Sequence, residues 1–259
     1  CSGLVGSEMC IRDSPLRDAW KVRVMMSFST IQRMPRINMK MQDPIVIFGK
    51  WAEEGKDVGM EKGHANSVKE MLEFACKERA DLGKKFSFLD VGCGNGWVVR
   101  DIGENKLCER AVGIDGAQQM IANAESRDKK NKYIQTDIDS FSPFKRFDLI
   151  HSMEVFYYLK NPSKTIKRIC DNWLNPNGRL IIGIDRYYEN FQSHSWEEKV
   201  GTPMHLMKEQ EWKAILEKSG FFGVKTWRVN SSKDWKGTLV ITGKTKQFLQ
   251  NLQRRKANV

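Results

Sequence analysis

Long apolar runs and paired cysteines are both missing from this 259-residue sequence. Its longest apolar runs, PIVIF at 44–48 and LIIGI at 180–184, have the length of β-strands and fall far short of the roughly 18–20 residues that a membrane span needs. The six cysteines show neither paired spacing nor metal-ligand spacing, and no secretory hydrophobic region accompanies them. We therefore expect a cytoplasmic protein in a reducing compartment, with no metal site and no membrane span.

Disorder and collagen-like structure are excluded by a composition of 40% hydrophobic, 29% charged and 10% aromatic residues. The net charge of +11 is unevenly distributed: residues 15–42 carry +5, residues 199–259 carry +9, and residues 43–198 carry −2. Because the central segment has no excess of Lys and Arg for a phosphate backbone, nucleic acid is not the expected partner. The basic tail at 245–259 can contact RNA or an acidic surface, or can simply be solvated.

The N-terminal residues fall into two parts. Residues 4–14, LVGSEMCIRDS, resemble the in-frame translation of a transposase adapter used to prepare sequencing libraries, so we treat 1–14 as an artefact and leave it out of the fold prediction. Residues 15–42 are rich in Arg and Met and poor in acids. They are translated upstream sequence before a later start, an organelle transit peptide, or a native basic arm, and the sequence leaves these alternatives open.

Strand patterns alternate with helix patterns from residue 43 to residue 244. This alternation predicts a single α/β domain: a parallel sheet covered by helices on both faces, with right-handed crossovers, in a doubly wound, Rossmann-like fold. In such sheets, ligands bind beyond the carboxyl ends of the strands. The expected strands are 86–92, 111–115, 132–137, 147–152 and 179–185, the expected helices are 64–80, 96–105, 117–127, 161–174 and 208–220, and the stretches 221–229 and 236–244 are expected to form a terminal antiparallel pair.

A glycine-rich motif, DVGCGNG at 90–96, follows the first expected strand. Glycines at alternate positions let the backbone turn tightly and approach a ligand closely, and the next helix offers free N–H groups there. The dinucleotide-binding fingerprint is G-x-G-x-x-G. Here the third glycine comes one residue early, and Trp97 stands in its place. This displacement, together with the lack of a hydride-transfer constellation, weakens the alternative of a dehydrogenase.

Acidic residues also end the next two expected strands. Asp115 can accept two hydrogen bonds from a ribose diol, and Asp137, followed by Ile138, can accept a hydrogen bond from an adenine amino group. Taken alone, Asp115 is equally well explained as a helix N-cap and Asp137 as a turn residue. The glycine motif and both acids at successive strand ends together favour a site for a nucleoside-containing ligand.

These motifs, with GID at 113–115, TDID at 136–139 and FDLIHSMEVFYYLKNP at 147–162, resemble the class I S-adenosylmethionine-dependent methyltransferases, in particular a small-molecule group that includes quinone-biosynthesis enzymes. The resemblance covers about 45–244 and implies a seven-stranded, mostly parallel sheet ending in an antiparallel hairpin. It also implies S-adenosylmethionine as cofactor. The implied cofactor contacts are Asp90, Gly92, Cys93, Gly94, Asn95 and Gly96 around the methionine part, Asp115 and Gly116 at the ribose, Asp137 and Ile138 at the adenine, and Ser152 near the sulfonium.

Methyl transfer from a sulfonium needs only a nucleophile held in line with the methyl group and shielded from water, so catalytic residues are harder to identify than cofactor contacts. His151, at the end of the fourth strand, is the predicted general base, if the nucleophile must lose a proton. The insertion at 186–206 is expected to form a lid with the N-terminal segment. The predicted substrate contacts are Phe156, Tyr157, Tyr187, Trp196 and His205, for which core packing or a surface loop is the alternative.

The segment after the fourth strand also narrows the choice of methyl acceptor. Enzymes that methylate exocyclic amines of bases often carry an Asn/Asp-Pro-Pro-aromatic tetrad there, whereas this chain has HSME at 151–154. We therefore expect a small-molecule acceptor. An RNA or protein methyltransferase and a non-catalytic cofactor-binding module remain alternatives, and the acceptor atom and the oligomeric state are not specified by the sequence.

The interpretation of the N-terminus yields a first prediction. A chain that starts at Met34 is expected to fold and to bind the cofactor as the full chain does, because the residues before it lie outside the recognised domain. Thermal unfolding and cofactor titration of both chains measure this. A cooperative loss of thermal stability in the shorter chain would show instead that the basic arm is part of the folded structure.

Overall fold

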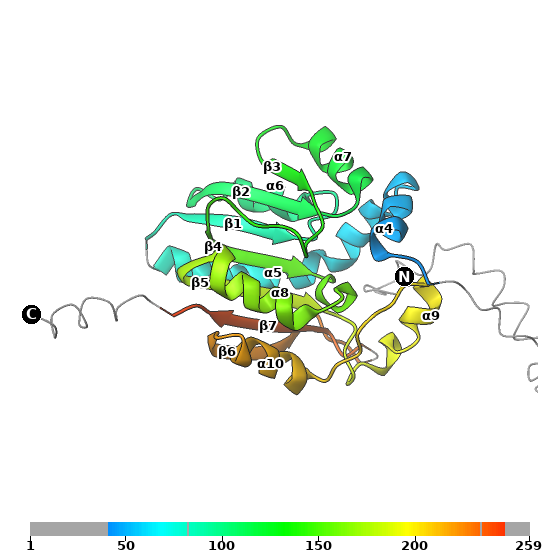
Figure 1. Cartoon of the computed structure of the whole chain (residues 1–259). Helices are drawn as coiled ribbons and strands as arrows, with labels where there is room; N and C mark the ends of the chain where they lie inside the picture. The colour runs from blue at the N-terminus through cyan, green and yellow to red at the C-terminus, as the bar shows by residue number, and fades with distance from the viewer. Residues whose placement is uncertain (1–40, 82, 234, 247–259) are drawn as a thin grey trace, which may run out of the picture.

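A seven-stranded sheet organises the protein, in the spatial order β3-β2-β1-β4-β5-β7-β6 (Figure 1). The computed structural model describes residues 41–81, 83–233 and 235–246, so the predictions for 1–14, for nearly all of 15–42 and for most of the tail lie outside the described residues. Strands β1 to β5 pair in parallel, and β7 is antiparallel to both β5 and β6. The predicted doubly wound sheet with an antiparallel C-terminal hairpin is confirmed. The strands are β1 Phe86–Val91, β2 Cys108–Asp115, β3 Lys132–Gln135, β4 Phe147–Met153, β5 Leu174–Ile184, β6 Phe222–Val229 and β7 Thr238–Lys244.

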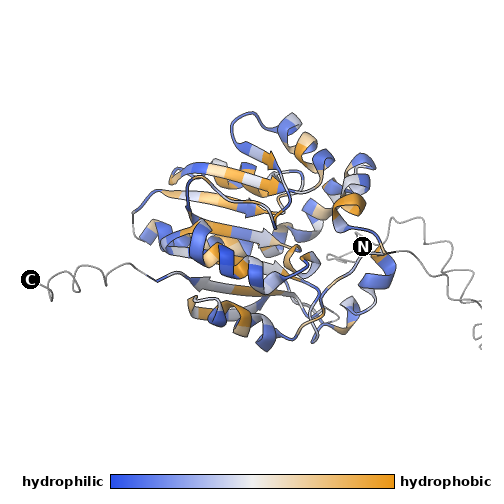
Figure 2. Cartoon of the chain, in the orientation of Figure 1, coloured by the Kyte–Doolittle hydropathy of each residue, from blue (hydrophilic) through white to orange (hydrophobic). Residues whose placement is uncertain are grey.

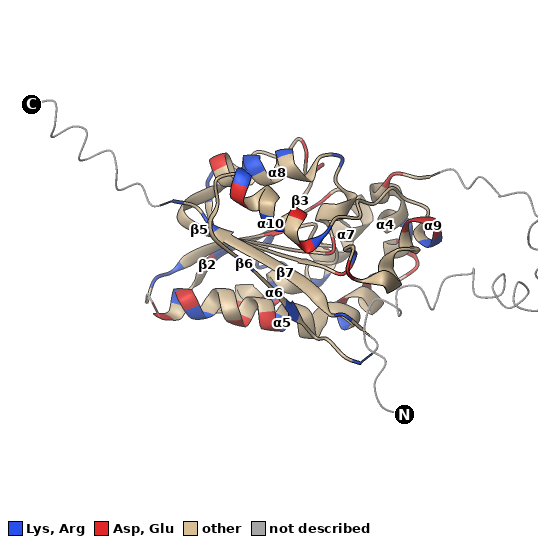
Figure 3. Ribbon diagram, turned by 90° about the horizontal axis from the view of Figure 1, so that it is seen from below, with Lys and Arg blue, Asp and Glu red and all other residues tan. Residues whose placement is uncertain are grey.

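Helices cover both faces of this sheet. Figure 3 shows α5 and α6 below the sheet and α8 and α10 above it. None of the helices in the described part of the chain is long and apolar enough to traverse a bilayer. The helices are α4 Pro44–Glu53, α5 Asp57–Asp81, α6 Trp97–Gly103, α7 Gln118–Arg127, α8 Pro162–Arg168, α9 Trp196–Val200 and α10 Glu209–Lys218, with short 3-10 turns at Phe156–Tyr158 and Phe191–Ser193.

Successive residues of the central strand β1 face opposite apolar layers, because side chains alternate along a strand. All six residues of β1 are buried. Phe88 packs in a cluster that contains Met71 of α5, whereas Leu89 packs in a second cluster that contains Trp212 of α10. Apolar residues gather on the strands and on the helix sides that cover them (Figure 2). The core therefore has two apolar layers, one on each face of the sheet.

Several expected elements differ from the structure in type or in their boundaries. The apolar run at 44–48, which has the length of a strand, forms the start of α4, because Asp43 caps the helix by accepting a hydrogen bond from the Ile45 N–H at 2.9 Å and Pro44 occupies the first turn. The helix expected over 161–174 ends at Arg168 and continues as one π-turn before β5, which begins at Leu174. Helix α5 also begins before residue 64, at Asp57.

The two-layer core leads to a stability prediction. Leu89 is 0% exposed, so Leu89→Ala is expected to reduce the free energy of unfolding by about 2–5 kcal/mol, through lost apolar burial and the cavity left behind. Phe144 is 99% exposed, and Phe144→Ala serves as the control, with an expected change within about 0.5 kcal/mol. Chemical denaturation measures both, and similar losses in the two variants would contradict this description of the core.

Candidate functional site

A cavity of about 690 Å³ lies beyond the carboxyl ends of the central strands. Its walls come from the loops that follow β1, β2, β3 and β4, from α4 and the start of α5, and from the insertion after β5. This is the position at which doubly wound sheets bind ligands. Among the described residues, the cavity is lined by 41–45, 48, 57, 60, 61, 64, 90, 92–95, 97, 98, 115, 116, 120, 137–139, 151, 153–155, 157–160, 197 and 203–205.

The glycines of the loop after β1 serve different purposes. Gly92 has φ +73°, and a Cβ there would lie 2.2 Å from a methyl carbon of Val155, so the loop packs against the segment after β4. Gly94 has φ +52°, and its nearest neighbour would be the Met120 sulfur at 3.9 Å. A side chain at Gly94 would therefore extend into the cavity. Because glycine has none, a ligand has room to approach the backbone there.

Asp115 connects this loop to the start of α7. Its carboxylate accepts hydrogen bonds from the Gly94 N–H at 3.0 Å and from the Ala117 N–H at 2.8 Å, while the side chain also lines the cavity. Burial raises the pKa of Asp115 to about 6, although these backbone hydrogen bonds oppose the shift. The capping interpretation and the binding interpretation of Asp115 are thus compatible, because each carboxylate oxygen has a second lone pair.

Most of the other predicted cofactor contacts line the cavity, and the rest pack behind its wall. Asp137 and Ile138 line the cavity, and the Asp137 carboxylate also accepts the Asp139 N–H at 2.8 Å, which makes the predicted turn. Asn95 lines the cavity and donates to Asp57 of α5 at 3.0 Å. Gly116 and Cys93 are also in the wall, whereas Gly96 is covered by the Tyr133 ring, 2.4 Å from where a Cβ would lie.

His151 lies at the cavity wall in a pair with Asp90. The His151 Nδ1 and Asp90 Oδ1 atoms are 2.7 Å apart, and the two residues are 0% and 2% exposed. A carboxylate at Nδ1 favours the proton on that nitrogen, which leaves Nε2 as an acceptor. Nε2 has no hydrogen-bond partner among the described residues. The pair therefore presents one oriented, unpaired imidazole nitrogen at the end of β4.

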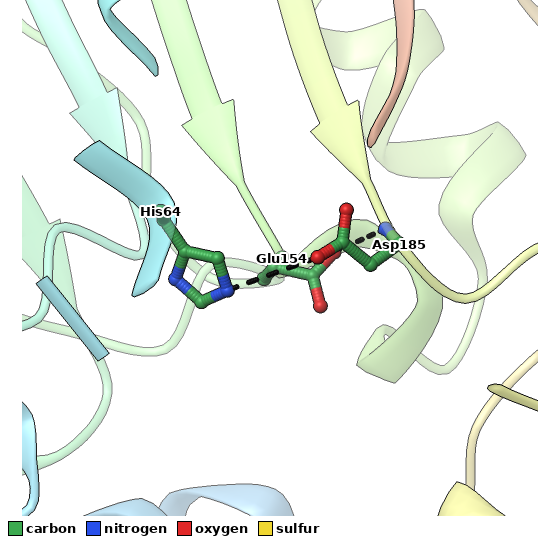
Figure 4. Close-up of side chains that lie close together, drawn as sticks. All are labelled: His64, Glu154 and Asp185. Carbon is green, nitrogen blue, oxygen red and sulfur yellow. Dashed lines mark hydrogen bonds and ion pairs between the residues drawn. The ribbon is translucent and has the colours of Figure 1, made fainter. Parts of the chain in front are cut away.

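A second polar cluster, consisting of His64, Glu154 and Asp185, was not anticipated from the sequence (Figure 4). His64 comes from α5, while Glu154 follows β4 and Asp185 follows β5. Their ligand atoms lie within 4.8 Å of one another. Glu154 has φ +61°, a backbone conformation that is uncommon outside glycine and is often found at functional sites. Chain spacing could not reveal this cluster, because each residue comes from a different element.

The cavity wall is strongly acidic although the whole chain is basic. His64, His151 and His205 are the histidines of the wall. Among the described lining residues, the acids are Asp43, Asp57, Glu61, Asp90, Asp115, Asp137, Asp139, Glu154 and Glu197, against Lys160 as the one Lys or Arg.

The insertion after β5 and the N-terminal segment meet over the cavity. The Gln42 N–H donates to the Gly201 carbonyl at 2.8 Å. Phe48 of α4 packs edge-on against Tyr158, with ring centroids 5.1 Å apart. The insertion contributes Glu197 and residues 203–205 to the wall, including the predicted His205. This cover, which we call the roof (residues 41–53 and 186–206), encloses the cavity from the side opposite the sheet.

Several predicted residues lie away from the cavity. Ser152 is fully buried and donates to a carbonyl of β1 at 2.7 Å. Phe156 belongs to the apolar core, and so does Trp196 of the roof. The Tyr187 hydroxyl donates to the Gly237 carbonyl at 2.9 Å. Of the predicted substrate contacts, Tyr157 and His205 line the cavity, and the ligand contacts of the others stay predictions.

Some of the wall residues that the sequence did not single out come from α4 and α5. Ile45 and Phe48 belong to the run that has the length of a strand, and Met60 and Glu61 lie in the first turns of α5, before the helix expected from residue 64. The sequence pattern therefore assigned neither pair to a helix. Which side of each helix faces a ligand is decided by tertiary packing.

Comparison with known proteins identifies the family. A family model described as a methyltransferase domain matches residues 57–226. A malonyl-[acyl-carrier protein] O-methyltransferase of Halalkalibacterium halodurans is 28% identical over 149 residues, which are 51% of this chain and 54% of the relative. A ubiquinone biosynthesis O-methyltransferase of Bradyrhizobium diazoefficiens is 30% identical over 108 residues, 40% of this chain and 42% of the relative. The chain thus matches about half the length of these relatives.

Solved structures agree on the fold. A chain in the complex of the Haloferax volcanii Trm112 methyltransferase activator with a methyltransferase has a TM-score of 0.67 and 25% identity, and the match covers 80% of this chain and 100% of that one. The N-methyltransferase NodS of Bradyrhizobium japonicum, solved with S-adenosylhomocysteine, has a TM-score of 0.54 and 21% identity over 68% of this chain and 84% of NodS. With the glycine loop and the strand-end acids, these findings confirm the resemblance: the chain belongs to the class I S-adenosylmethionine-dependent methyltransferases.

Proposed function

We propose that this protein transfers the methyl group of S-adenosylmethionine to a small-molecule acceptor. The observation that carries the proposal is the roofed cavity of about 690 Å³, which lies within the range of about 300–1,000 Å³ typical of small-molecule sites. Relatives named as methyltransferases of malonyl-[acyl-carrier protein], of ubiquinone biosynthesis and of trans-aconitate support a small-molecule acceptor. The acidic wall of the cavity does not favour a polyanionic acceptor such as RNA.

The cavity wall fits the cofactor along one side. The open space at Gly94 admits a ligand close to the backbone, and the free lone pairs of Asp115 can accept hydrogen bonds from a ribose diol. Ile138 offers an apolar surface and Asp137 an acceptor at the place expected for the adenine. S-adenosylmethionine, when bound, supplies a methyl group on a positively charged sulfur that is already activated toward a nucleophile.

The remaining residues of this chain orient the acceptor and exclude water. The roof shields the cavity, which strengthens electrostatic interactions within it. His151 presents an unpaired Nε2 held by Asp90, so it can take a proton from an acceptor that must lose one. A base is unnecessary for an acceptor that is already nucleophilic, which makes His151 a proposed base and not a requirement of the fold.

A labelled-methyl experiment tests the proposal. The protein is incubated with methyl-labelled S-adenosylmethionine and with cell extract separated into metabolite, RNA and protein fractions. We expect label in the metabolite fraction. Label on RNA that disappears between about 50 and 200 mM salt would overturn the small-molecule proposal, because binding that neutralises several phosphates weakens steeply with ionic strength. Absence of label from every fraction, with cofactor binding intact, would favour a non-catalytic binding module.

Asp115 gives a sharper prediction for the cofactor. Asp115→Ala is expected to weaken the binding of S-adenosylhomocysteine about tenfold or more, because it removes hydrogen bonds to a charged acceptor worth about 1.5–3 kcal/mol. Titration calorimetry measures this. In the unaltered protein, affinity is also expected to fall as the pH drops below about 6, because the raised pKa of Asp115 means that the carboxylate protonates there and loses acceptor capacity.

Two comparisons make the Asp115 result specific. Asp101→Ala removes an exposed acid of α6 and is expected to leave the affinity unchanged. The Asp115→Ala variant is expected to lose the pH dependence along with the affinity. Unchanged binding in that variant would show that Asp115 only joins the glycine loop to α7.

A further inference from the structure

His64, Glu154 and Asp185 bring acceptor atoms together, and not all of these atoms have a donor among the described residues (Figure 4). His64 Nε2 lies 3.9 Å from Asp185 Oδ2, too far for a hydrogen bond. His64 is 9% exposed and Asp185 is 2% exposed. Oδ1 of Asp185 is also buried without a partner in the described part of the chain. A buried group of this kind costs free energy unless a donor completes it.

Burial shifts the pKa values of all three groups toward their uncharged forms. Burial lowers the pKa of His64 to about 4, against a hydrogen bond to the Met60 carbonyl, so the ring is neutral at physiological pH and Nε2 is an acceptor. Burial raises the pKa of Asp185 to about 6, opposed by the Thr238 hydroxyl. Burial and the nearby charge of Asp185 raise the pKa of Glu154 well above its ordinary value. Such shifts report an acidic pair that lacks a cation.

Glu154 is fixed by neighbours but keeps acceptor capacity. Its carboxylate accepts hydrogen bonds from the Asp185 N–H and from the Tyr157 hydroxyl, the latter at 2.6 Å. A carboxylate has about four lone-pair sites, so these two bonds orient Glu154 and leave room for a ligand. Glu154 and His64 both line the cavity, which gives a ligand access to the cluster.

The spacing of the acceptors distinguishes a metal ion from an ammonium group. Around Zn²⁺ or Mg²⁺, with bonds of about 2.0–2.1 Å, neighbouring ligand atoms lie about 3.0–3.4 Å apart. Around an ammonium nitrogen with hydrogen bonds of about 2.9 Å, the acceptors lie up to about 4.7 Å apart. The 3.9 Å separation of His64 Nε2 and Asp185 Oδ2 exceeds the first spacing and falls within the second.

We propose that His64, Glu154 and Asp185 bind the ammonium group of the methyl acceptor, so that the acceptor is a small alkylamine. For its nitrogen to take the methyl group, the bound ammonium first gives one proton to a carboxylate of the cluster. The nitrogen lone pair then forms the N–C bond as the methyl–sulfur bond breaks, which leaves S-adenosylhomocysteine and a methylated ammonium product. This inference rests on the proposed function, since it names the chemical class of its acceptor. The ammonium group supplies the missing donors and the missing positive charge together. The aromatic rings of Phe48 and Tyr158, which line the same cavity, suit the cation and the carbon chain that carries it.

Three probes that share one aromatic ring and differ in the polar group test the proposal. They are 2-phenylethylamine, 2-phenylethanol and phenylacetate, each titrated at neutral pH into the full-length protein saturated with S-adenosylhomocysteine. Dissociation constants come from ligand-observed NMR. We expect the ammonium probe to bind at least tenfold more tightly than the alcohol and the carboxylate, because only it offers positive N–H donors to the acidic cluster.

Isosteric variants assign the preference to the cluster. Glu154→Gln and Asp185→Asn keep the size of the side chain and remove its charge, and each is expected to weaken binding of the ammonium probe at least tenfold and to change binding of the alcohol less than twofold. Glu198→Gln, at an exposed position of α9 outside the cavity wall, is the charge-matched control and is expected to change neither. Thermal unfolding and the affinity for S-adenosylhomocysteine report whether each variant is folded.

The outcomes separate this inference from the proposed function. Loss of S-adenosylhomocysteine binding by the unaltered protein would sink the proposed function itself. Intact binding of S-adenosylhomocysteine with equal affinity for the three probes would overturn only the amine inference. A Zn²⁺ titration tests the alternative that the cluster binds a metal ion. A stoichiometric Zn²⁺ site that both isosteric variants abolish, in a protein without preference for the ammonium probe, would show that the cluster is a metal site. Tight ammonium binding that only the cluster variants weaken would support the amine acceptor.

Discussion

The register between β1 and β4 is the constraint on which the arrangement of the site depends. Asp90 of β1 and His151 of β4 are direct partners in this parallel pair, so their side chains meet on one face at the end of the strands. A slip of one residue would turn His151 to the opposite face of the sheet. Buried residues on both faces of β1 fix the register, because a slip would exchange the contents of the two apolar layers. The core thus determines the position of a polar pair that is itself buried, with the His151 ring stacked on Phe88 at a centroid distance of 6.2 Å.

The same logic explains which parts of the site could be predicted from the sequence. The glycine loop and the acids Asp115 and Asp137 are local signals, because each lies directly after a strand and strand ends meet at one edge of a parallel sheet. The fold class alone therefore predicts that the glycine loop, Asp115 and Asp137 lie close together. The parallel sheet covered by helices was predictable for a similar reason, since alternating strand and helix patterns leave few ways to build a sheet. The number of strands was implied by the family resemblance.

The cluster of His64, Glu154 and Asp185 and the roles of the aromatic residues could not be predicted in this way. The cluster depends on the angle at which α5 crosses the sheet, and no local pattern specifies that angle. Tyr157 and its neighbour Phe156 both belong to the apolar core, yet only Tyr157 also lines the cavity. Hydrophobicity does not distinguish the two side chains, so only the turn geometry after β4 gives them different roles. Helix α4 was hidden because its apolar run is short, and capping by Asp43 decides its structure.

The hydrogen bond between Gln42 and Gly201 has a kinetic consequence. It joins the two segments of the roof, 41–53 and 186–206, which are far apart in the sequence. Tyr187 and Trp196 hold the second segment in the apolar core, whereas the first segment packs in a small cluster around Ala117 and Met120. The interior of a sheet opens only with the whole domain, whereas a segment with few buried apolar contacts opens at a smaller free energy. Exchange of a bound molecule with solvent can therefore proceed through local opening of residues 41–53 while the strand ends keep the geometry of the reacting groups. One part of the chain thus opens to exchange the bound molecule, while another part keeps the site in place.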